Sequence, residues 1–81
     1  MSIRVLFFAS LADIAGTRET SVDSGAFTDV ASVFDQFARK FPPLEKYRSS
    51  ALFALNSEFA KPESPVRDGD ELAFFPPVSG G

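Results

Sequence analysis

The last residues of the chain are the ones whose types and spacing could take part in chemistry. The sequence ends in Pro76, Pro77, Val78, Ser79, Gly80 and Gly81. Two prolines fix φ twice and favour an extended backbone, so residues 76–81 are predicted to project from the domain as a tail. Two glycines without side chains would let this tail enter a narrow channel in another protein. The reactive group at its tip would be the α-carboxylate of Gly81.

This carboxylate needs activation before it can react. A terminal carboxyl has a pKa of about 3.3–3.7, so it is anionic at neutral pH and a poor electrophile. A partner could convert it with ATP to an acyl-adenylate, and attack by a sulfur donor would then leave a thiocarboxylate. The chain has no Cys that would intercept the activated end. The competing interpretation is an inert, frayed terminus, which is what most termini are.

The remaining residue types argue against an enzyme that acts alone. The chain contains no Cys and no His, which excludes disulfides, Cys/His zinc sites, thiolate iron–sulfur clusters and nucleophiles activated by His. The one dense acidic group, Asp68, Asp70 and Glu71, is better explained by a turn at Asp68-Gly69-Asp70 than by a cation site. We therefore expect a chain that is not catalytic alone and binds no metal or cofactor.

Charge and hydropathy limit the classes of partner that this chain could bind. The net charge is −3, and the eight Lys and Arg are scattered, whereas nucleic acids and anionic membranes require a basic stripe. The apolar run over residues 5–9 is too short to cross a bilayer or to serve as a signal peptide. The lack of Cys fits a cytoplasmic protein. We expect no nucleic-acid or membrane partner.

Periodicity predicts the elements that must position the tail. In a chain of 81 residues with ten Phe there is room for one aromatic-rich core. Helical spacing of apolar residues predicts a helix over 28–41, with Thr28 as N-cap and Pro42-Pro43 as its end. A short helical turn, capped by Ser10, is predicted over 10–15, and a polar connection over 44–50. Strands are predicted over 3–8, 17–22, 51–55, 58–60 and 71–75.

The order of these elements predicts an α+β fold of the ubiquitin-like β-grasp type. Residues 1–75 would form a mixed sheet of four to five strands packed on one main helix, with 76–81 as the tail. The first and last strands would lie side by side and parallel. That pairing puts Phe8 and Phe75 on the same outer face, with Phe59 on a nearby strand. An outward aromatic cluster indicates a partner site, although these side chains could instead fill the core.

The residues that end the chain carry a family resemblance. The block 68–81, with its Phe74-Phe75-Pro76-Pro77-Val78 followed by Gly80-Gly81, closely resembles the C-terminus of the small subunits of molybdopterin synthases, the MoaD-like sulfur carriers. Residues 5–9 are similar to the first strand of that family, and residues 54–58 to a further patch. One departure is Ala12-Asp13, where members often carry an Arg before the acidic residue.

The resemblance implies a specific role. A ubiquitin-activating-like enzyme would adenylate Gly81 using ATP, and a sulfurtransferase would supply the sulfur of the thiocarboxylate. The tail, Pro76 to Gly80, would insert into the large synthase subunit, which provides the catalytic side chains. There the sulfur would pass to cyclic pyranopterin monophosphate in molybdenum cofactor biosynthesis. The family assembles as a heterotetramer, and contact through Phe8, Phe59 and Phe75 is implied.

Two other functions remain open at this point. The chain could be a sulfur carrier for thiamine or for tRNA thiolation, although the Phe74-to-Pro77 run argues against this. It could also be a ubiquitin-like modifier joined to target lysines, or an interaction module with an inert tail.

Overall fold

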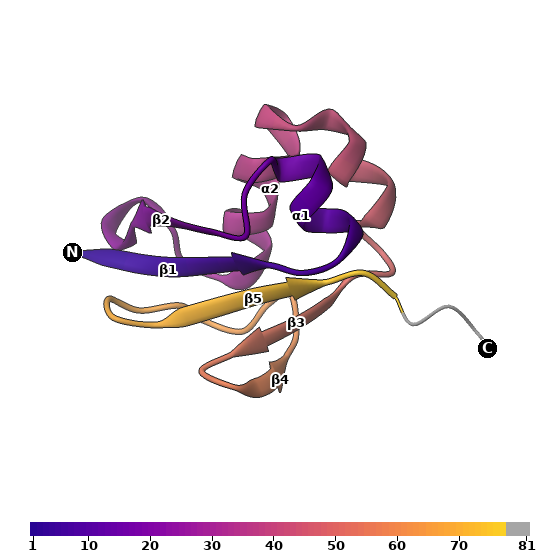
Figure 1. The fold of residues 1–81 in the computed structure, drawn as a ribbon. Helices are drawn as coiled ribbons and strands as arrows, with labels where there is room; N and C mark the ends of the chain where they lie inside the picture. The colour runs from indigo at the N-terminus through magenta and orange to yellow at the C-terminus, as the bar shows by residue number, and fades with distance from the viewer. Residues whose placement is uncertain (78–81) are drawn as a thin grey trace.

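The fold is a five-stranded sheet with its main helices on one side (Figure 1). The computed structural model describes residues 1–77. Within that range, none of the helices is long and apolar enough to cross a membrane. The elements in chain order are β1 (Ser2–Phe7), α1 (Ser10–Ala15), β2 (Glu19–Asp23), the 3₁₀ helix η1 (Ser24–Ala26), α2 (Val30–Lys40), the 3₁₀ helix η2 (Pro42–Tyr47), β3 (Leu52–Leu55), β4 (Glu58–Ala60) and β5 (Glu71–Phe75).

The sheet has the order β2-β1-β5-β3-β4. β1 and β5 are parallel, with Phe7 opposite Phe74, and the other three pairings are antiparallel. A parallel pair needs a crossover, and α2 lies on the segment that provides it. The predicted α+β arrangement, with the first and last strands adjacent and parallel, is confirmed. The predicted β2 is shifted toward the C-terminus, and β1 ends one residue before Phe8.

The core centres on the fully buried ring of Phe74 in β5. The rings of Phe7, Phe34 and Phe53 have centroids 5.5–5.6 Å from it, and that of Phe37 lies at 6.4 Å. Most of these pairs are edge-to-face, a geometry that adds about 0.5–1.5 kcal/mol per pair beyond the burial of apolar area. The Phe content noted in the sequence therefore serves largely to pack α2 against the middle strands.

The structure corrects the predicted N-caps of both α-helices. Asp29, not Thr28, is the N-cap of α2: its Oδ1 accepts from the Ser32 backbone N–H at 2.8 Å, and Ser32 Oγ accepts from the Asp29 N–H at 3.2 Å. This reciprocal capping box satisfies two backbone donors at once, which Thr28 alone could not do. Ser10 caps nothing, because it is already the first residue of α1.

The segment after α2 is not the polar connection predicted from its sequence. Pro42-Pro43 ends α2 as expected, but η2 follows at once and its Leu44 is fully buried. Arg48 holds η2 against α2, since it pairs with Asp35 and Glu45. The hydrogen bond from Arg48 lowers the pKa of Glu45 and raises that of Arg48. Leu44 is followed by a mostly polar run, so the sequence shows no helical period here.

The backbone of the β3–β4 turn is strained, and relief of this strain should stabilise the fold. Asn56 and Ser57 both have positive φ, 52° and 71°, and such two-residue hairpin turns favour Asn-Gly. We expect Ser57→Gly to raise the free energy of unfolding by about 0.5–1 kcal/mol. Left-handed strain of about 1–2 kcal/mol is relieved, and the flexibility of glycine offsets roughly 0.5–1 kcal/mol of this. Urea unfolding would show a higher midpoint with an unchanged m-value.

Ser21→Gly on the exposed side of β2 is the control for this turn. It adds the same flexibility without relieving strain, so it should lower the free energy of unfolding by roughly 0.5–1 kcal/mol. Equal effects of the two substitutions would show that Ser57 is not strained.

Candidate functional site

The candidate site is the outer face of the sheet, on the side away from α1, α2 and η2 (Figure 1). No element between residues 1 and 77 covers this face. Alternate residues of each strand point to it, and the strand register aligns them in rows across the sheet. We call its apolar part the apolar patch, formed by Leu6, Phe8, Leu52, Ala54, Phe59, Ala73 and Phe75.

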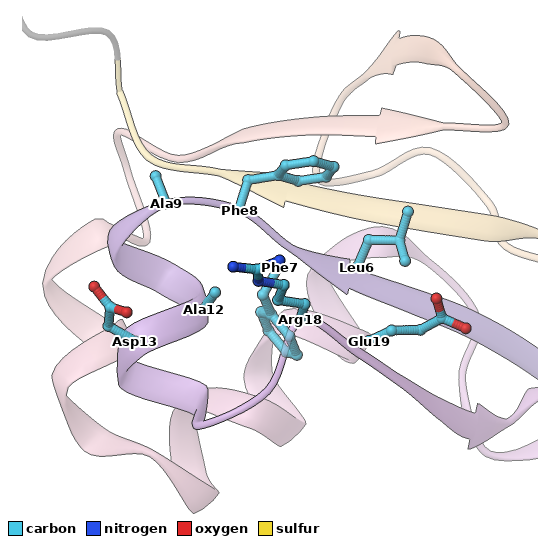
Figure 2. Close-up of a pocket in the computed structure, with 8 residues that line it drawn as sticks. All are labelled: Leu6, Phe7, Phe8, Ala9, Ala12, Asp13, Arg18 and Glu19. Atoms are coloured by element: carbon cyan, nitrogen blue, oxygen red, sulfur yellow. The ribbon is translucent and has the colours of Figure 1, made fainter.

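Phe8 and Phe75 form the centre of the apolar patch. Their rings are stacked, with centroids 4.4 Å apart and planes 13° from parallel. Phe8 is 41% exposed, and its backbone N–H donates to the Phe74 carbonyl at 3.1 Å, which continues the β1–β5 ladder by one residue. The ring of Phe8 lies over β5 (Figure 2). The prediction that these two residues share the outer face is confirmed, whereas their contact with a partner stays a prediction.

The patch extends beyond this stack across β3 to β4. Phe59 in β4 is 84% exposed and sits opposite Ala54, so β3 separates it from Phe75. Leu52, opposite Phe75, is 39% exposed. Sequence reasoning missed Leu52, because the run 51–55 reads as uniformly apolar. Successive side chains of a strand point to opposite faces, so the inward-facing Phe53 implies that Leu52 points outward.

The chain leaves the sheet next to this stack. Phe75 is the last residue of β5, and it is followed by a half-buried Pro76 and an exposed Pro77. The predicted tail residues Val78, Ser79, Gly80 and Gly81 lie outside the described residues. The structure therefore places the start of the predicted tail beside Phe8 and Phe75, at one end of the outer face.

A strained turn helps to place Phe8. Ala9 has φ 51° and ψ −129°, a combination that residues with a side chain rarely adopt. This turn leads the chain from β1 directly into α1 and leaves Phe8 facing outward. Beside it lies a shallow hollow of about 560 Å³ between α1, the end of β1 and the start of β2 (Figure 2). Phe8, Asp13 and Arg18 are among the residues that line it.

Charged residues from β1, β2 and β5 meet on the outer face. Arg4 in β1 is hydrogen-bonded to Glu71 in β5, and its Nε lies 3.7 Å from Oε2 of Glu19 in β2. Glu19 is paired with Leu6 in the strand register, so it lies in the same row as the apolar patch.

The acidic residues that precede β5 are explained by turn chemistry, as predicted. Gly69 has φ 89°, and Asp70 accepts from the Arg67 backbone N–H at 2.7 Å and from the Asn56 side chain at 2.9 Å. Among residues 1–77, no group of three or more His, Cys, Asp or Glu side chains is arranged to hold a metal ion.

The aromatic stack generates a prediction about coupling. Phe8→Ala and Phe75→Ala should each destabilise the fold, and the double-mutant cycle should give a coupling energy of about 0.5–1.5 kcal/mol in urea unfolding, as expected for a stacked aromatic pair. The same cycle for Phe8 with Phe59 should give a value near zero, because β5 and β3 separate them. Equal coupling in both cycles would contradict a specific stack.

The sequence of this chain is similar to those of known proteins. The sequence model of the ThiS family matches residues 5–81. The molybdopterin synthase sulfur carrier subunit of Chlamydomonas reinhardtii is 35% identical, with complete coverage of both chains. The subunit of the same name from Escherichia coli is 37% identical over 98% of this chain and 99% of its own.

A solved structure shows the same fold. The crystal structure of SAMP1, small archaeal modifier protein 1, from Haloferax volcanii superposes with a TM-score of 0.81 at 34% identity, with complete coverage of both chains. The predicted ubiquitin-like β-grasp fold is thereby confirmed.

Proposed function

This chain belongs to the ThiS family, and we propose that it is the sulfur-carrier subunit of a molybdopterin synthase. The observation that carries the proposal is the full-length similarity to relatives of that name at 35% and 37% identity. The matched region includes residues 78–81, and so the Gly80-Gly81 end. The proposal places this protein in the cytoplasm, where ATP is available for activation.

The proposed reactions take place at the carboxylate of Gly81. An adenylating enzyme of the ubiquitin-activating type would join a carboxylate oxygen to the α-phosphorus of ATP and release pyrophosphate. A sulfide equivalent from a sulfurtransferase would attack the acyl carbon and release AMP, which leaves a thiocarboxylate. In the synthase the thiocarboxylate sulfur would bond to a carbon of cyclic pyranopterin monophosphate and displace an oxygen substituent from that carbon, which leaves a thioester between the carrier and the pterin. Water would then cleave the acyl–sulfur bond and restore the carboxylate. Because a dithiolene contains two sulfur atoms, the formation of one product molecule would consume two loaded carriers.

The geometry supports a carrier that works inside a complex. Phe8, Leu52 and Phe59 of the apolar patch are exposed, and the Phe8–Phe75 stack adjoins the start of the predicted tail. A large subunit that covered this patch would bind the carrier and receive Pro76 to Gly81 in one event. The chain lacks His and Cys, so general acid–base groups for the reaction would come from that large subunit. The heterotetramer implied by the family resemblance is part of this proposal.

A protein modifier is the second candidate function. The observation that favours it is the 34% identity to SAMP1, whose full name describes a modifier. Both functions begin with activation of the terminal carboxylate, and they differ in the acceptor. A modifier would form an amide with a lysine of another protein, whereas a carrier would transfer sulfur and return unmodified. A sulfur carrier for thiamine synthesis or for tRNA thiolation would differ only in the molecule that accepts the sulfur.

Intact mass tests the loading step. After incubation with ATP, the adenylating enzyme and a sulfur donor, we expect the mass to rise by the difference between sulfur and oxygen. Deletion of Gly81 should abolish this gain and leave the urea midpoint unchanged, because the buried core lies between Ile3 and Phe74. An unchanged mass with an active partner system would reject the sulfur-carrier role, and lysine-linked conjugates would favour the modifier.

Calorimetry tests the apolar patch as the docking surface. Phe75→Ala should weaken binding of the large subunit by about 2 kcal/mol or more, as expected for a buried aromatic anchor. Phe59→Ala gives a cleaner test, because the 84% exposed ring makes little contact within the folded chain. It should weaken binding without lowering stability. Unchanged affinity in both variants would place the interface elsewhere.

A further inference from the structure

The sheet has two open edges, β2 and β4 (Figure 1), and β2 is poorly suited to accept a further strand. The Arg18 carbonyl, just before β2, accepts from the Phe7 N–H of β1. Alternation therefore turns the backbone groups of Glu19 and Ser21 away from β1. The Glu19 N–H and C=O are both already bonded to the hydroxyl of Thr17, and a charged side chain on an edge strand discourages pairing.

β4 presents an open backbone donor and acceptor at its edge. The Asn56 N–H donates to the Glu71 carbonyl of β5 at 2.8 Å. Alternation along β3 therefore turns the backbone groups of Ala54 toward β5 as well. Because Phe59 is paired with Ala54, the N–H and C=O of Phe59 point away from β3, to the open side. None of the loop, turn or side-chain hydrogen bonds of residues 1–77 uses either group.

An apolar groove of about 410 Å³ adjoins Phe59. Leu52 and Pro62 are among the apolar residues that line it, together with Phe59, whose side chain is 84% exposed. No Asp or Glu of residues 1–77 lines the groove, but two cations do. Arg48 is already paired with two carboxylates, whereas Lys61 makes no ion pair within residues 1–77. An apolar side chain followed by a carboxylate would complement this groove.

We propose that an extended segment of the large subunit adds a strand at the β4 edge by exchanging backbone hydrogen bonds with Phe59. The segment places an apolar side chain in the groove and a carboxylate beside Lys61. The inference rests on the proposed function and deepens it. Phe59 belongs to both the apolar patch and this edge, so one partner can cover both. Apolar contact is non-directional, whereas the backbone bonds fix how the partner is oriented on the sheet. A second copy fits less well, because two-fold pairing centred on Phe59 sets Lys61 opposite Ser57.

Amide hydrogen exchange, followed by NMR, tests the proposal on the unsubstituted protein. In the free chain we expect the Phe59 N–H to exchange rapidly, because it has no acceptor, and the Ala60 N–H to exchange slowly, because it faces β3. In the complex with the large subunit, exchange at Phe59 should slow at least tenfold. The Ser21 N–H, at the open edge of β2, is the control and should exchange rapidly in both states. Rapid exchange at Phe59 in the complex would overturn the inference and leave the proposed function intact.

Two substitutions at Phe59 separate the backbone bond from the ring. Phe59→Ala removes the ring and keeps the N–H, whereas Phe59→Pro removes both. Proline is tolerated on an edge strand where the N–H faces solvent, and urea unfolding checks that the variant folds. In calorimetry with the large subunit, Phe59→Pro should bind at least fivefold more weakly than Phe59→Ala. Ser21→Pro and Ser21→Ala, the matched pair on β2, should bind equally. Equal affinities of the two Phe59 variants would contradict strand addition.

Charge reversal tests the carboxylate that is assigned to the partner. Lys61→Glu should weaken binding at least fivefold at low salt and less at high salt. Lys40→Glu makes the same change of net charge in α2, on the other side of the sheet, and should bind as the unsubstituted chain does. Equal effects of the two reversals would reject the assigned carboxylate.

The remaining outcomes distinguish the occupants of the edge. Slower exchange at Phe59 in the isolated chain as its concentration rises would assign the edge to a second copy and overturn the inference. Failure of the unsubstituted chain to bind the large subunit would instead reject the proposed function as well.

Discussion

The parallel pairing of β1 with β5 is the constraint on which the rest of the structure depends. It joins the two ends of the described chain at the centre of the sheet, and it requires the crossover on which α2 lies. Its inner side places Phe7 and Phe74 in the core. Its outer side stacks Phe8 on Phe75. One backbone ladder thus builds the core, forms the centre of the candidate docking surface and sets where the chain leaves the sheet.

The division of labour follows from what the chain lacks. Without His or Cys, it has neither the side chain whose unperturbed pKa lies near neutral pH nor a thiol nucleophile. A carboxyl end can still carry an acyl-bound atom between proteins, provided that the fold presents it and a surface beside it is recognised. The two faces of the sheet separate these tasks: the inner face packs the core, and the outer face is the candidate docking surface.

The elements that sequence reasoning missed share a physical cause. η2 contains one buried apolar residue, Leu44, and a single contact has no period to detect. The N-cap of α2 was placed one residue early, because Thr28 and Asp29 are both good caps. Only the position of Ser32 relative to the first helical turn decides in favour of Asp29. In both cases the local residue types were compatible with more than one structure, and packing selected among them.

The order of the elements along the sequence, which is that of a β-grasp fold, predicted the parallel pairing of the first and last strands and so the shared face of Phe8 and Phe75. The sequence by itself also determined the elements with strong periodicity. Alternation along a strand and helical spacing are local properties, so they can be read without the fold. Only the tertiary structure decided that Leu52 lies opposite Phe75 in the apolar patch, and that Arg4 of β1 meets both Glu19 of β2 and Glu71 of β5. These residues come from different strands, and the register that aligns them arises from packing of the whole sheet on α2.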